Sequence, residues 1–239
     1  MADDMATHGR ASARIPKQQR SRETQHAILE AALAVFAERG YEGASMRRIG
    51  QRAGVGQPLV VYHFPTKEAL WIATVKAALG KFLERIAPLL DALDGLDPTT
   101  TVRFIFKQFV HFCAATPELL PLMIEANRRG GPVLTQVIDD QLRITFESLR
   151  RLIEAGQTAG NIPSGDPALI YYSMVAVASM VFALPREFEV LTGRDPRDPD
   201  IVEAQADLLG RLFFTSVNAR GRAHFPAHAR VLTRTSDEG

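Results

Sequence analysis

Residues 45–67, which read SMRRIGQRAGVGQPLVVYHFPTK, constrain the fold of this chain more than any other segment. Their order predicts a short helix, a glycine turn, a second short helix, an aromatic exit and the start of a longer helix. The segment contains Arg47, Arg48, Arg52 and Lys67 but no acidic residue. Two short helices joined by a tight turn, with a surface that tolerates a phosphate backbone, are typical of a helix-turn-helix that binds DNA.

The charge of the chain is unevenly distributed. The 239 residues carry a formal net charge of only +1. Residues 10–67 hold ten basic and four acidic residues, whereas residues 68–239 carry a net charge of −3. A basic amino-terminal part on a near-neutral body indicates a nucleic-acid-binding head with a separate second domain. The hydrophobic content of 46% is enough for a real core.

The cysteine content and the hydropathy of the chain indicate the cellular compartment in which it is expected. Cys113 is the single cysteine, which excludes an internal disulfide and predicts a reducing cytoplasm. The first twenty residues lack the apolar core of a signal peptide. Residues 167–185 are uncharged, and the stretch is long enough to cross a membrane as a helix. However, Tyr171 and Tyr172 lie within it and prolines bracket it. A buried interface helix explains this stretch better, so no membrane partner is predicted.

The amino-terminal helices follow from periodicity and from their caps. Apolar residues at helical spacing predict a first helix over residues 21–39, with Gly40 as its C-cap. Ser45 is the predicted N-cap of a second helix that Gly54 ends, because a tight turn favours positive φ. A third helix is predicted over residues 57–63, and Thr66 is the predicted N-cap of a fourth.

The remaining helices are marked by a capping residue followed by proline. This pair occurs at residues 97–98, 116–117, 166–167 and 198–199, with a weaker Gly-Pro version at 131–132. The marks predict helices near residues 98–115, 117–127, 132–159, 167–192 and 199–218, and Pro88 is expected to kink or end the fourth helix. No segment alternates with period two. The predicted fold is all-α, with about nine helices.

These boundaries divide the chain into four parts. Residues 1–19 are a basic arm without apolar periodicity and are expected to be disordered; whether the arm contacts DNA stays open. Residues 20–66 form the predicted helix-turn-helix domain. Residues 67–218 form a helical domain for effector binding and dimerisation, and residues 219–239 are a basic tail that is also expected to be disordered.

The arrangement resembles the tetracycline-repressor-like (TetR) family of transcriptional regulators. Three fragments carry the resemblance, and all lie within residues 21–75. FAERGYEGAS looks like the first-helix exit, RRIGQRAGV like the second helix and turn, and VVYHFPTKEAL like the recognition-helix exit and fourth-helix start. Residues beyond 75 resemble the family only in architecture, which is a helical ligand-binding and dimerisation domain.

The resemblance implies DNA contacts for individual residues. Arg47 looks like a second-helix residue that reaches a base edge, where a guanidinium suits guanine. Gln57 suits adenine at the start of the recognition helix, and the apolar residues near it suit thymine methyl groups. The remaining positions suit phosphate through amide, hydroxyl, imidazole or ammonium donors. The implied DNA-binding set is Ser45, Arg47, Gln57, Pro58, Leu59, Val61, Tyr62, His63 and Lys67.

Two positions depart from the family pattern. The family usually has a hydroxyl at the position of Gly56, and glycine donates nothing from a side chain. It usually has an aromatic residue at the position of Val61, where a valine still contacts a thymine methyl group. These departures put the affinity and the sequence preference in doubt rather than DNA binding itself.

The second domain is expected to dimerise and to bind an effector. The helices from Asp166 and Asp198 are the dimer candidates, because the first is apolar nearly all round. The candidate interface residues are Tyr171, Tyr172, Val175, Phe182, Leu208 and Leu212. The candidate pocket residues are Phe104, Phe109, Phe112, Met123, Phe146 and Met174, although such residues are more often ordinary core. The candidate polar anchors are His111, Glu125, Asn127 and Arg128.

The expected function is therefore a ligand-responsive transcriptional regulator. A dimer would bind a pseudo-palindromic double-stranded DNA operator as a repressor, and a small, largely apolar molecule would release it. Activation by the ligand stays open. No cofactor is expected.

Two other functions fit the sequence less well. The chain has no G-x-S-x-G, G-x-G-x-x-G or P-loop motif, so an enzyme is not expected. His224 and His228 have metal-like spacing but lack a third ligand, so no metal site is predicted. The alternative is a helical interaction or ligand-binding protein without sequence-specific DNA binding. An acid-free basic stretch disfavours that alternative.

Overall fold

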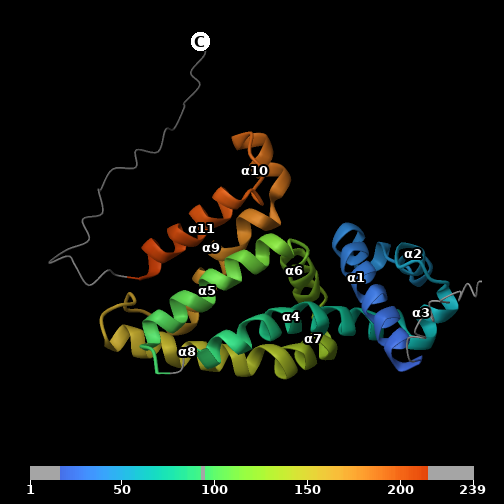
Figure 1. Ribbon diagram of the computed structural model, residues 1–239, viewed down its shortest axis with the longest axis horizontal. Coiled ribbons are helices and arrows are strands. Elements are labelled where there is room, and N and C mark those ends of the chain that lie inside the picture. Colours follow the sequence, from blue (N-terminus) through green and yellow to red (C-terminus); the bar gives the residue numbers. More distant parts are fainter. Residues whose placement is uncertain (1–16, 93–94, 215–239) are drawn as a thin grey trace, which may run out of the picture.

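The computed structural model describes residues 17–92 and 95–214, and these residues form helices and no strand. Figure 1 shows a small three-helix head at one end and a larger helical body, with the long helix α4 running from one into the other. The all-α prediction is confirmed. Outside the described residues lie residues 1–16 of the predicted arm, the predicted tail with His224 and His228, and residues 215–218 of the last predicted helix.

The head consists of α1 (Lys17–Gly43), α2 (Met46–Arg52) and α3 (Gln57–His63). Helix α1 begins inside the segment 1–19 that was expected to lack structure. Its apolar stripe packs inward as its spacing predicts, and α2 adds the buried Ile49 and Gly50 and α3 the buried Val60. The buried side chains of this small core include Ile28, Ala32, Val35, Phe36, Ile49 and Val60.

Caps and turns place these short helices. Gly40 has a φ of 66° and interrupts the helical geometry of α1, as a C-cap glycine does. The Ser45 hydroxyl accepts a hydrogen bond of 3.3 Å from the amide of Arg48, which is the predicted N-cap of α2. Gly54 has a φ of 69° in the turn before α3. The Thr66 hydroxyl accepts a bond of 3.0 Å from the Ala69 amide and so caps α4. All four caps and turns are confirmed.

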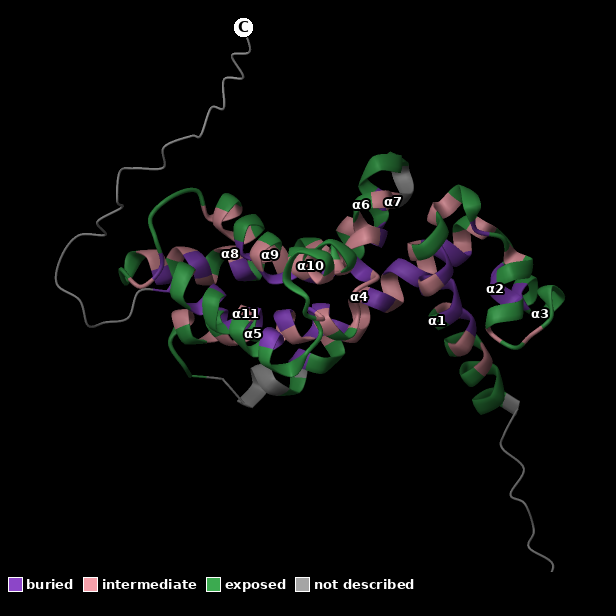
Figure 2. Ribbon diagram, turned by 90° about the horizontal axis from the view of Figure 1, so that it is seen from above, coloured by how far each residue is buried: buried purple, intermediate pink, exposed green. Residues whose placement is uncertain are grey.

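The body is built around α5. In chain order its elements are α4 (Lys67–Ala92), α5 (Pro98–Ala115), α6 (Leu119–Arg129), α7 (Gly131–Val137), the π-helix η1 (Ile138–Leu142), α8 (Arg143–Thr158), α9 (Pro167–Ala183), α10 (Pro185–Thr192) and α11 (Pro199–Phe213). Helix α5 packs against α8, α9 and α11, and it also contacts α4. Figure 2 shows the buried residues along the inward sides of these helices.

Three predicted boundaries need correction. Residues 132–159 do not form one helix, because the π-turn η1 divides them into α7 and α8. Residues 167–192 form α9 and α10, which meet at an angle of 71°, because Pro185 lacks an amide hydrogen and its ring blocks a continuous helix. Helix α6 starts at Leu119, and Thr116 closes α5 instead of opening α6. The divided helices raise the number above the nine expected, and Pro88 does not end α4.

The close approach of α2 and α3 depends on Gly50, which lies buried in α2. A Cβ atom added to Gly50 would lie 2.9 Å from the Val55 carbonyl oxygen and 3.1 Å from Cγ2 of Val60. The first neighbour is backbone and cannot rotate away. The turn and the recognition helix can therefore lie this close to α2 because residue 50 has no side chain.

We expect Gly50→Ala to lower the free energy of unfolding by about 1–3 kcal/mol, because overpacking outweighs the gain in helix propensity. Gly80→Ala is the matched control, since Gly80 lies inside α4 with no atom within 4 Å of the added Cβ. That variant should be more stable by roughly 1 kcal/mol. Urea unfolding followed by circular dichroism measures both. Equal stabilisation of the two variants would contradict the role of Gly50.

Candidate DNA-binding surface and effector cavity

Helix α3 presents one buried and one exposed face. Val60 has no exposed surface and anchors the helix to the head. On the other side Tyr62 is 78% exposed, and Leu59 and Val61 are about half as exposed. Gln57 and Pro58 are also exposed at the first turn. The five residues expected to contact DNA on this helix, apart from His63, thus lie on an accessible helix surface, and a major groove admits one α-helix.

Free positive charge lies beside this surface. Arg47 and Arg48 are exposed on α2, and within the described residues no acidic side chain pairs with either guanidinium. Arg52, in contrast, donates to Glu38 at 2.6 Å. Because an unpaired guanidinium loses no ion pair on contacting DNA, Arg47 and Arg48 suit base edges or phosphate. Ser45 is exposed at the start of α2, where the helix N-terminus favours an anion.

The aromatic exit of α3 carries two further expected contacts. The rings of Tyr62 and His63 meet edge to face with centroids 5.2 Å apart. His63 is half-buried, and its neighbour Phe64 is buried in the head. The contact with His63 holds the exposed Tyr62 ring at the end of the recognition helix, where its hydroxyl suits a phosphate.

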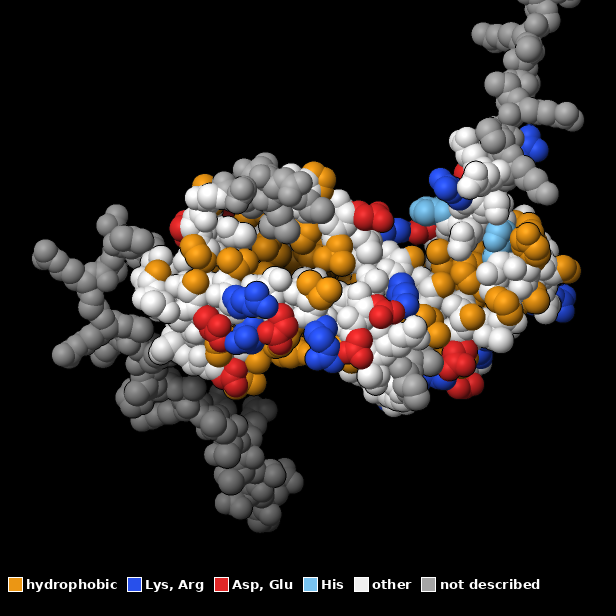
Figure 3. All heavy atoms as spheres, turned by 90° about the horizontal axis from the view of Figure 1, so that it is seen from below, with side chains coloured by type: hydrophobic (Ala, Val, Ile, Leu, Met, Phe, Trp, Pro, Cys, Tyr) orange, Lys and Arg blue, Asp and Glu red, His pale blue; other side chains and the backbone are white. Residues whose placement is uncertain are grey.

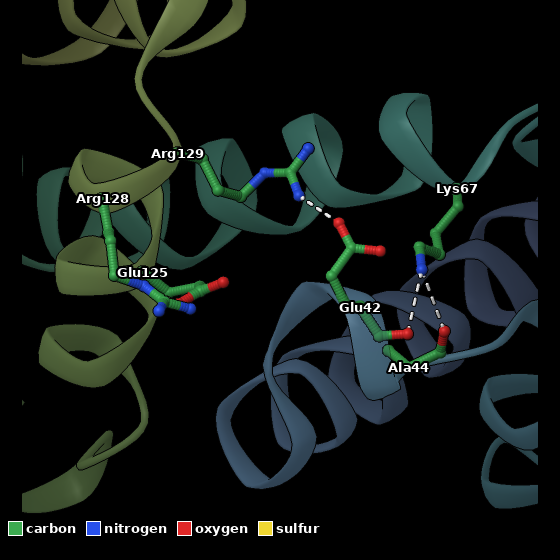
Figure 4. Close-up of polar contacts among 6 residues, drawn as sticks. All are labelled: Glu42, Ala44, Lys67, Glu125, Arg128 and Arg129. Carbon is green, nitrogen blue, oxygen red and sulfur yellow. Dashed lines mark hydrogen bonds and ion pairs between the residues drawn. The ribbon is translucent and has the colours of Figure 1, made fainter.

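Lys67 lies differently from the sequence expectation. Its ammonium group donates to the carbonyl oxygens of Ala44 at 3.2 Å and Glu42 at 3.5 Å, and it lies 4.3 Å from the centroid of the Tyr41 ring. Figure 4 shows the side chain turned back onto the end of α1. In this conformation Lys67 joins α4 to the end of α1 and does not face outward as a phosphate contact would.

Arg129, a residue of the body, contacts the same tyrosine, Tyr41. The Arg129 guanidinium at the end of α6 lies 3.5 Å from the Tyr41 centroid and pairs with Glu42 at 3.0 Å. Burial raises the pKa of Tyr41, although the Arg129 charge opposes this shift. We call Tyr41, Glu42, Lys67 and Arg129 the junction cluster. It ties the end of α1 to both α4 and α6.

A cavity of about 550 Å³ lies in the body between α4, α5, α6, η1, α8 and α9. Its wall is mostly apolar, and it includes exposed residues of α6 and α9 at its rim. The size and the apolar wall are those of a small-molecule site. In the space-filling view of Figure 3, hydrophobic side chains gather over the body.

Aromatic rings form a continuous part of this wall. The Phe82 and Phe109 centroids lie 5.2 Å apart, and those of Phe146 and Tyr171 lie 5.1 Å apart. Burial, and secondarily the neighbouring Tyr172, raises the pKa of Tyr171 to about 12. Burial likewise raises the pKa of Cys113, another wall residue, to about 12. Both groups are therefore neutral at physiological pH.

The candidate pocket residues divide into two groups. Phe109, Met123 and Phe146 line the cavity, whereas Phe104, Phe112 and Met174 do not. Phe112 and Met174 are buried in the core instead. Helical spacing identifies inward-facing residues but does not separate a cavity wall from filled core, because both need apolar side chains.

The candidate polar anchors divide as well. Asn127 lines the cavity. His111 lies 3.3 Å from Glu203 on α11, and Glu125 pairs with Arg128 on α6 at 2.7 Å (Figure 4). These three residues are engaged in contacts outside the cavity.

The candidate dimer residues also lie in two places. Tyr172, Leu208 and Leu212 expose their side chains on α9 and α11, which contact each other. Tyr171, Val175 and Phe182 line the cavity, and Phe182 is only 1% exposed. Phe182 cannot touch a partner from this position, which corrects its assignment. The reason is that α9 buries Phe182 in the cavity wall, whereas Tyr172 lies at the exposed rim of the same cavity.

The part of the chain that is described has neither a single membrane-spanning helix nor a metal cluster. There, none of the helices alone has the length and hydropathy of a membrane span; α9 and α10 reach them only as a pair, bent by 71°. The described residues contain no group of three or more His, Cys, Asp or Glu side chains that could hold a metal ion.

Two family sequence models match the chain in the places that the geometry suggests. The model for bacterial regulatory proteins of the tetR family matches residues 28–74, which cover most of the head and the start of α4. The model for the C-terminal domain of tetracyclin repressor-like proteins matches residues 98–212, which cover the body from α5 to α11. The chain belongs to the TetR family. It is a DNA-binding transcriptional regulator of that family.

Curated relatives agree with this assignment. The HTH-type transcriptional regulator RutR of Escherichia coli K12 is 24% identical over 194 residues, which are 81% of this chain and 90% of RutR. The HTH-type transcriptional repressor NicS of Pseudomonas putida KT2440 is 27% identical over 207 residues, 85% of this chain and 94% of NicS. The crystal structure of AibR with isovaleryl coenzyme A and operator DNA is similar in fold, with a TM-score of 0.65 and 21% identity over 80% of this chain and 98% of AibR.

The two departures from the TetR pattern now have a structural setting. Gly56 is the N-cap of α3 and has no side-chain hydrogen bond to the helix. A Cβ there would touch only Cδ of Pro58 at 3.5 Å, an ordinary contact, so space does not demand the glycine. Val61 is exposed on the surface of α3, where it offers a methyl contact but no hydrogen bond.

Sequence reasoning missed several residues of this TetR protein. Gly50 carries no signal, because its importance lies in a distance between two helices. Tyr41 and Arg129 are 88 residues apart along the sequence, and only the fold brings them together. Tyr171 was assigned to a dimer surface because the apolar run 167–185 gave no face a preference.

We expect Lys67 and Gln57 to have different roles, Lys67 in the stability of the fold and Gln57 in the recognition of a base pair. We expect Lys67→Ala to lower the free energy of unfolding by about 1 kcal/mol, because the carbonyls at the end of α1 lose their donor. Gln57→Ala should leave stability unchanged and reduce discrimination at one base pair by roughly 1–3 kcal/mol. Urea unfolding and binding to single-substitution operator duplexes measure the two effects. If Lys67→Ala instead keeps full stability and lowers the salt slope of DNA binding by about 1, Lys67 contacts phosphate.

Proposed function

We propose that this protein is a homodimeric repressor that binds a pseudo-palindromic operator and is released by a small, largely apolar molecule. The observation that carries the proposal is the exposed face of α3, flanked by the unpaired Arg47 and Arg48 on α2. An accessible recognition helix beside free guanidinium groups meets the needs of major-groove binding. Such a regulator acts in the cytoplasm, where it meets chromosomal DNA.

The exposed faces of α9 and α11 support dimerisation. Helix α9 exposes Leu169, Tyr172 and Met180, and α11 exposes Leu208 and Leu212, the last by 54%. Apolar side chains on two neighbouring helices are an unfavourable surface in water and favour a partner. A two-fold dimer through these helices would form a four-helix interface and place the two recognition helices for the half-sites of one operator.

The cavity and the junction cluster support a response to ligand. Helix α6 contributes Leu120, Met123 and Asn127 to the cavity wall, and it ends at Arg129 on the Tyr41 ring. A ligand that prefers another position of α6 would thereby change the angle of the head. A tenfold to hundredfold change in operator affinity needs only about 1.4–2.8 kcal/mol of differential affinity. The AibR structure, which contains both an acyl coenzyme A and operator DNA, supports this pairing of functions.

Selection of bound sequences from a random double-stranded DNA pool tests the proposal. We expect enrichment of a pseudo-palindrome whose half-sites lie about one DNA turn apart, roughly 34 Å. Affinity for the enriched site should fall with salt with a log–log slope near −5 if about six phosphates are contacted. No enrichment by the folded protein at low salt would refute sequence-specific binding. It would leave the alternative of a helical ligand-binding or interaction protein.

The junction cluster should matter for the dimeric operator more than for one half-site. We expect Arg129→Ala to weaken binding to the full operator about fivefold to tenfold. The reason is that the two heads of the dimer would then sample a wider range of distances from each other. Binding to a half-site duplex should stay the same. Arg128→Ala is the matched control, since Arg128 is on the same helix and pairs only within it. Fluorescence anisotropy with both duplexes measures the affinities, and equal losses on both would indicate damage to the head instead.

A further inference from the structure

The charged residues of the cavity wall are compensated by neighbours. Arg143 and Glu147 are the two ionisable side chains of the wall that are charged at neutral pH. The Arg143 Nε donates to Asp139 at 2.8 Å, and Glu147 accepts from Arg150 at 3.1 Å. Figure 3 shows basic and acidic side chains alternating on the body. A charged ligand group would therefore have to break an existing pair.

Among the uncharged hydrogen-bonding groups of the wall, some have no hydrogen-bond partner within the described residues. Asn127, Thr145 and Ser179 donate to carbonyl oxygens of their own helical segments. The Tyr171 hydroxyl and the Gln141 side-chain amide make no hydrogen bond with any described residue. Tyr171 stands among Phe106, Phe146 and Tyr172. Its hydroxyl is a neutral donor in apolar surroundings at neutral pH, and burial raises its pKa further.

We infer that the effector is uncharged where it enters the cavity and that one polar group of it hydrogen-bonds to Tyr171. The inference rests on the proposed function and specifies its ligand. An apolar wall stabilises an apolar body, whereas burying an unpaired charge costs far more than burying a group that can hydrogen-bond. The ligand class is that of alcohols, ketones, esters and thioesters with an apolar chain, as opposed to free carboxylates or amines.

The cavity volume limits the size of the buried part. A volume of about 550 Å³ holds on the order of 18 non-hydrogen atoms if each takes about 30 Å³, the share of a water molecule in the liquid. A ten-carbon chain with one polar end group therefore fits with room to spare. This makes a series of ten-carbon probes suitable.

The test compares 1-decanol, decanoate and decylammonium, which share one chain and differ in charge. Each probe displaces the neutral dye N-phenyl-1-naphthylamine from the full chain, below the concentration at which the probes form micelles. We expect 1-decanol to bind at least about tenfold more tightly than either ion, since a desolvated charge without a partner costs more than 1.4 kcal/mol. Equal or tighter binding of decanoate would overturn the inference.

Two substitutions sharpen the test. Tyr171→Phe should weaken 1-decanol about threefold to tenfold, because one hydrogen bond is lost and the ring is kept. Thr158→Val is its control, since it removes a hydroxyl on α8 that lies outside the cavity wall, and it should change little. Asp139→Asn should free Arg143 and tighten decanoate by about threefold while leaving 1-decanol unchanged. An unchanged affinity of Tyr171→Phe for 1-decanol would overturn the assignment of Tyr171.

The remaining outcomes separate this inference from the proposed function. Failure of the dye and of all three probes to bind would overturn the inference, while operator selection would still decide DNA binding. Tight binding of 1-decanol with no effect on operator affinity would support the ligand class and refute release by ligand. Operator selection that fails beside a positive probe series would refute the proposed repressor only.

Discussion

The ring of Tyr41, which contacts two cations, is where the end of α1 in the head meets α4 and α6. Lys67 approaches it from the start of α4, and Arg129 approaches it from the end of α6. Neither contact is strong alone, since a cation near an aromatic face contributes about 0.5–1 kcal/mol at an exposed site. Their importance lies in geometry. The end of α1 can keep its place only while α4 and α6 keep theirs.

This dependence connects the two sites. Helix α6 lines the cavity over most of its length, so that a ligand contacts the same element that holds the head. Within the head, Gly50 allows α3 to lie close against α2, and the exposed face of α3 takes its direction from that contact. The position of the recognition surface is therefore determined by a short series of contacts. These run from the cavity through Arg129 and Tyr41 to α1.

Helix α9 contributes both buried and exposed residues to the cavity. Tyr171 and Phe182 complete the aromatic wall, whereas Tyr172 and Met180 lie at its exposed rim. The cavity can stay apolar because the charges near it are paired along η1 and α8. The π-turn of η1 lies at the cavity and places Ile138 and Gln141 in its wall. Such turns occur often at functional sites, since they change the direction of side chains within a helix.

The sequence alone determined the all-α fold, the helix-turn-helix and most helix ends of the head. These features are local: caps such as Ser45 and Thr66, glycines at positive φ and apolar spacing act within a few residues. It also placed Gln57, Arg47 and Tyr62 on an accessible surface, because a short amphipathic helix has one buried side.

Only the tertiary structure decided the break at Pro185, the π-turn, the inward turn of Lys67 and the division between core and cavity among the phenylalanines. The physical reason is the same in each case. Apolar periodicity states that a side chain faces inward, but what it meets there, whether a filled core, an empty volume or a cation from another helix, depends on elements far away in the chain.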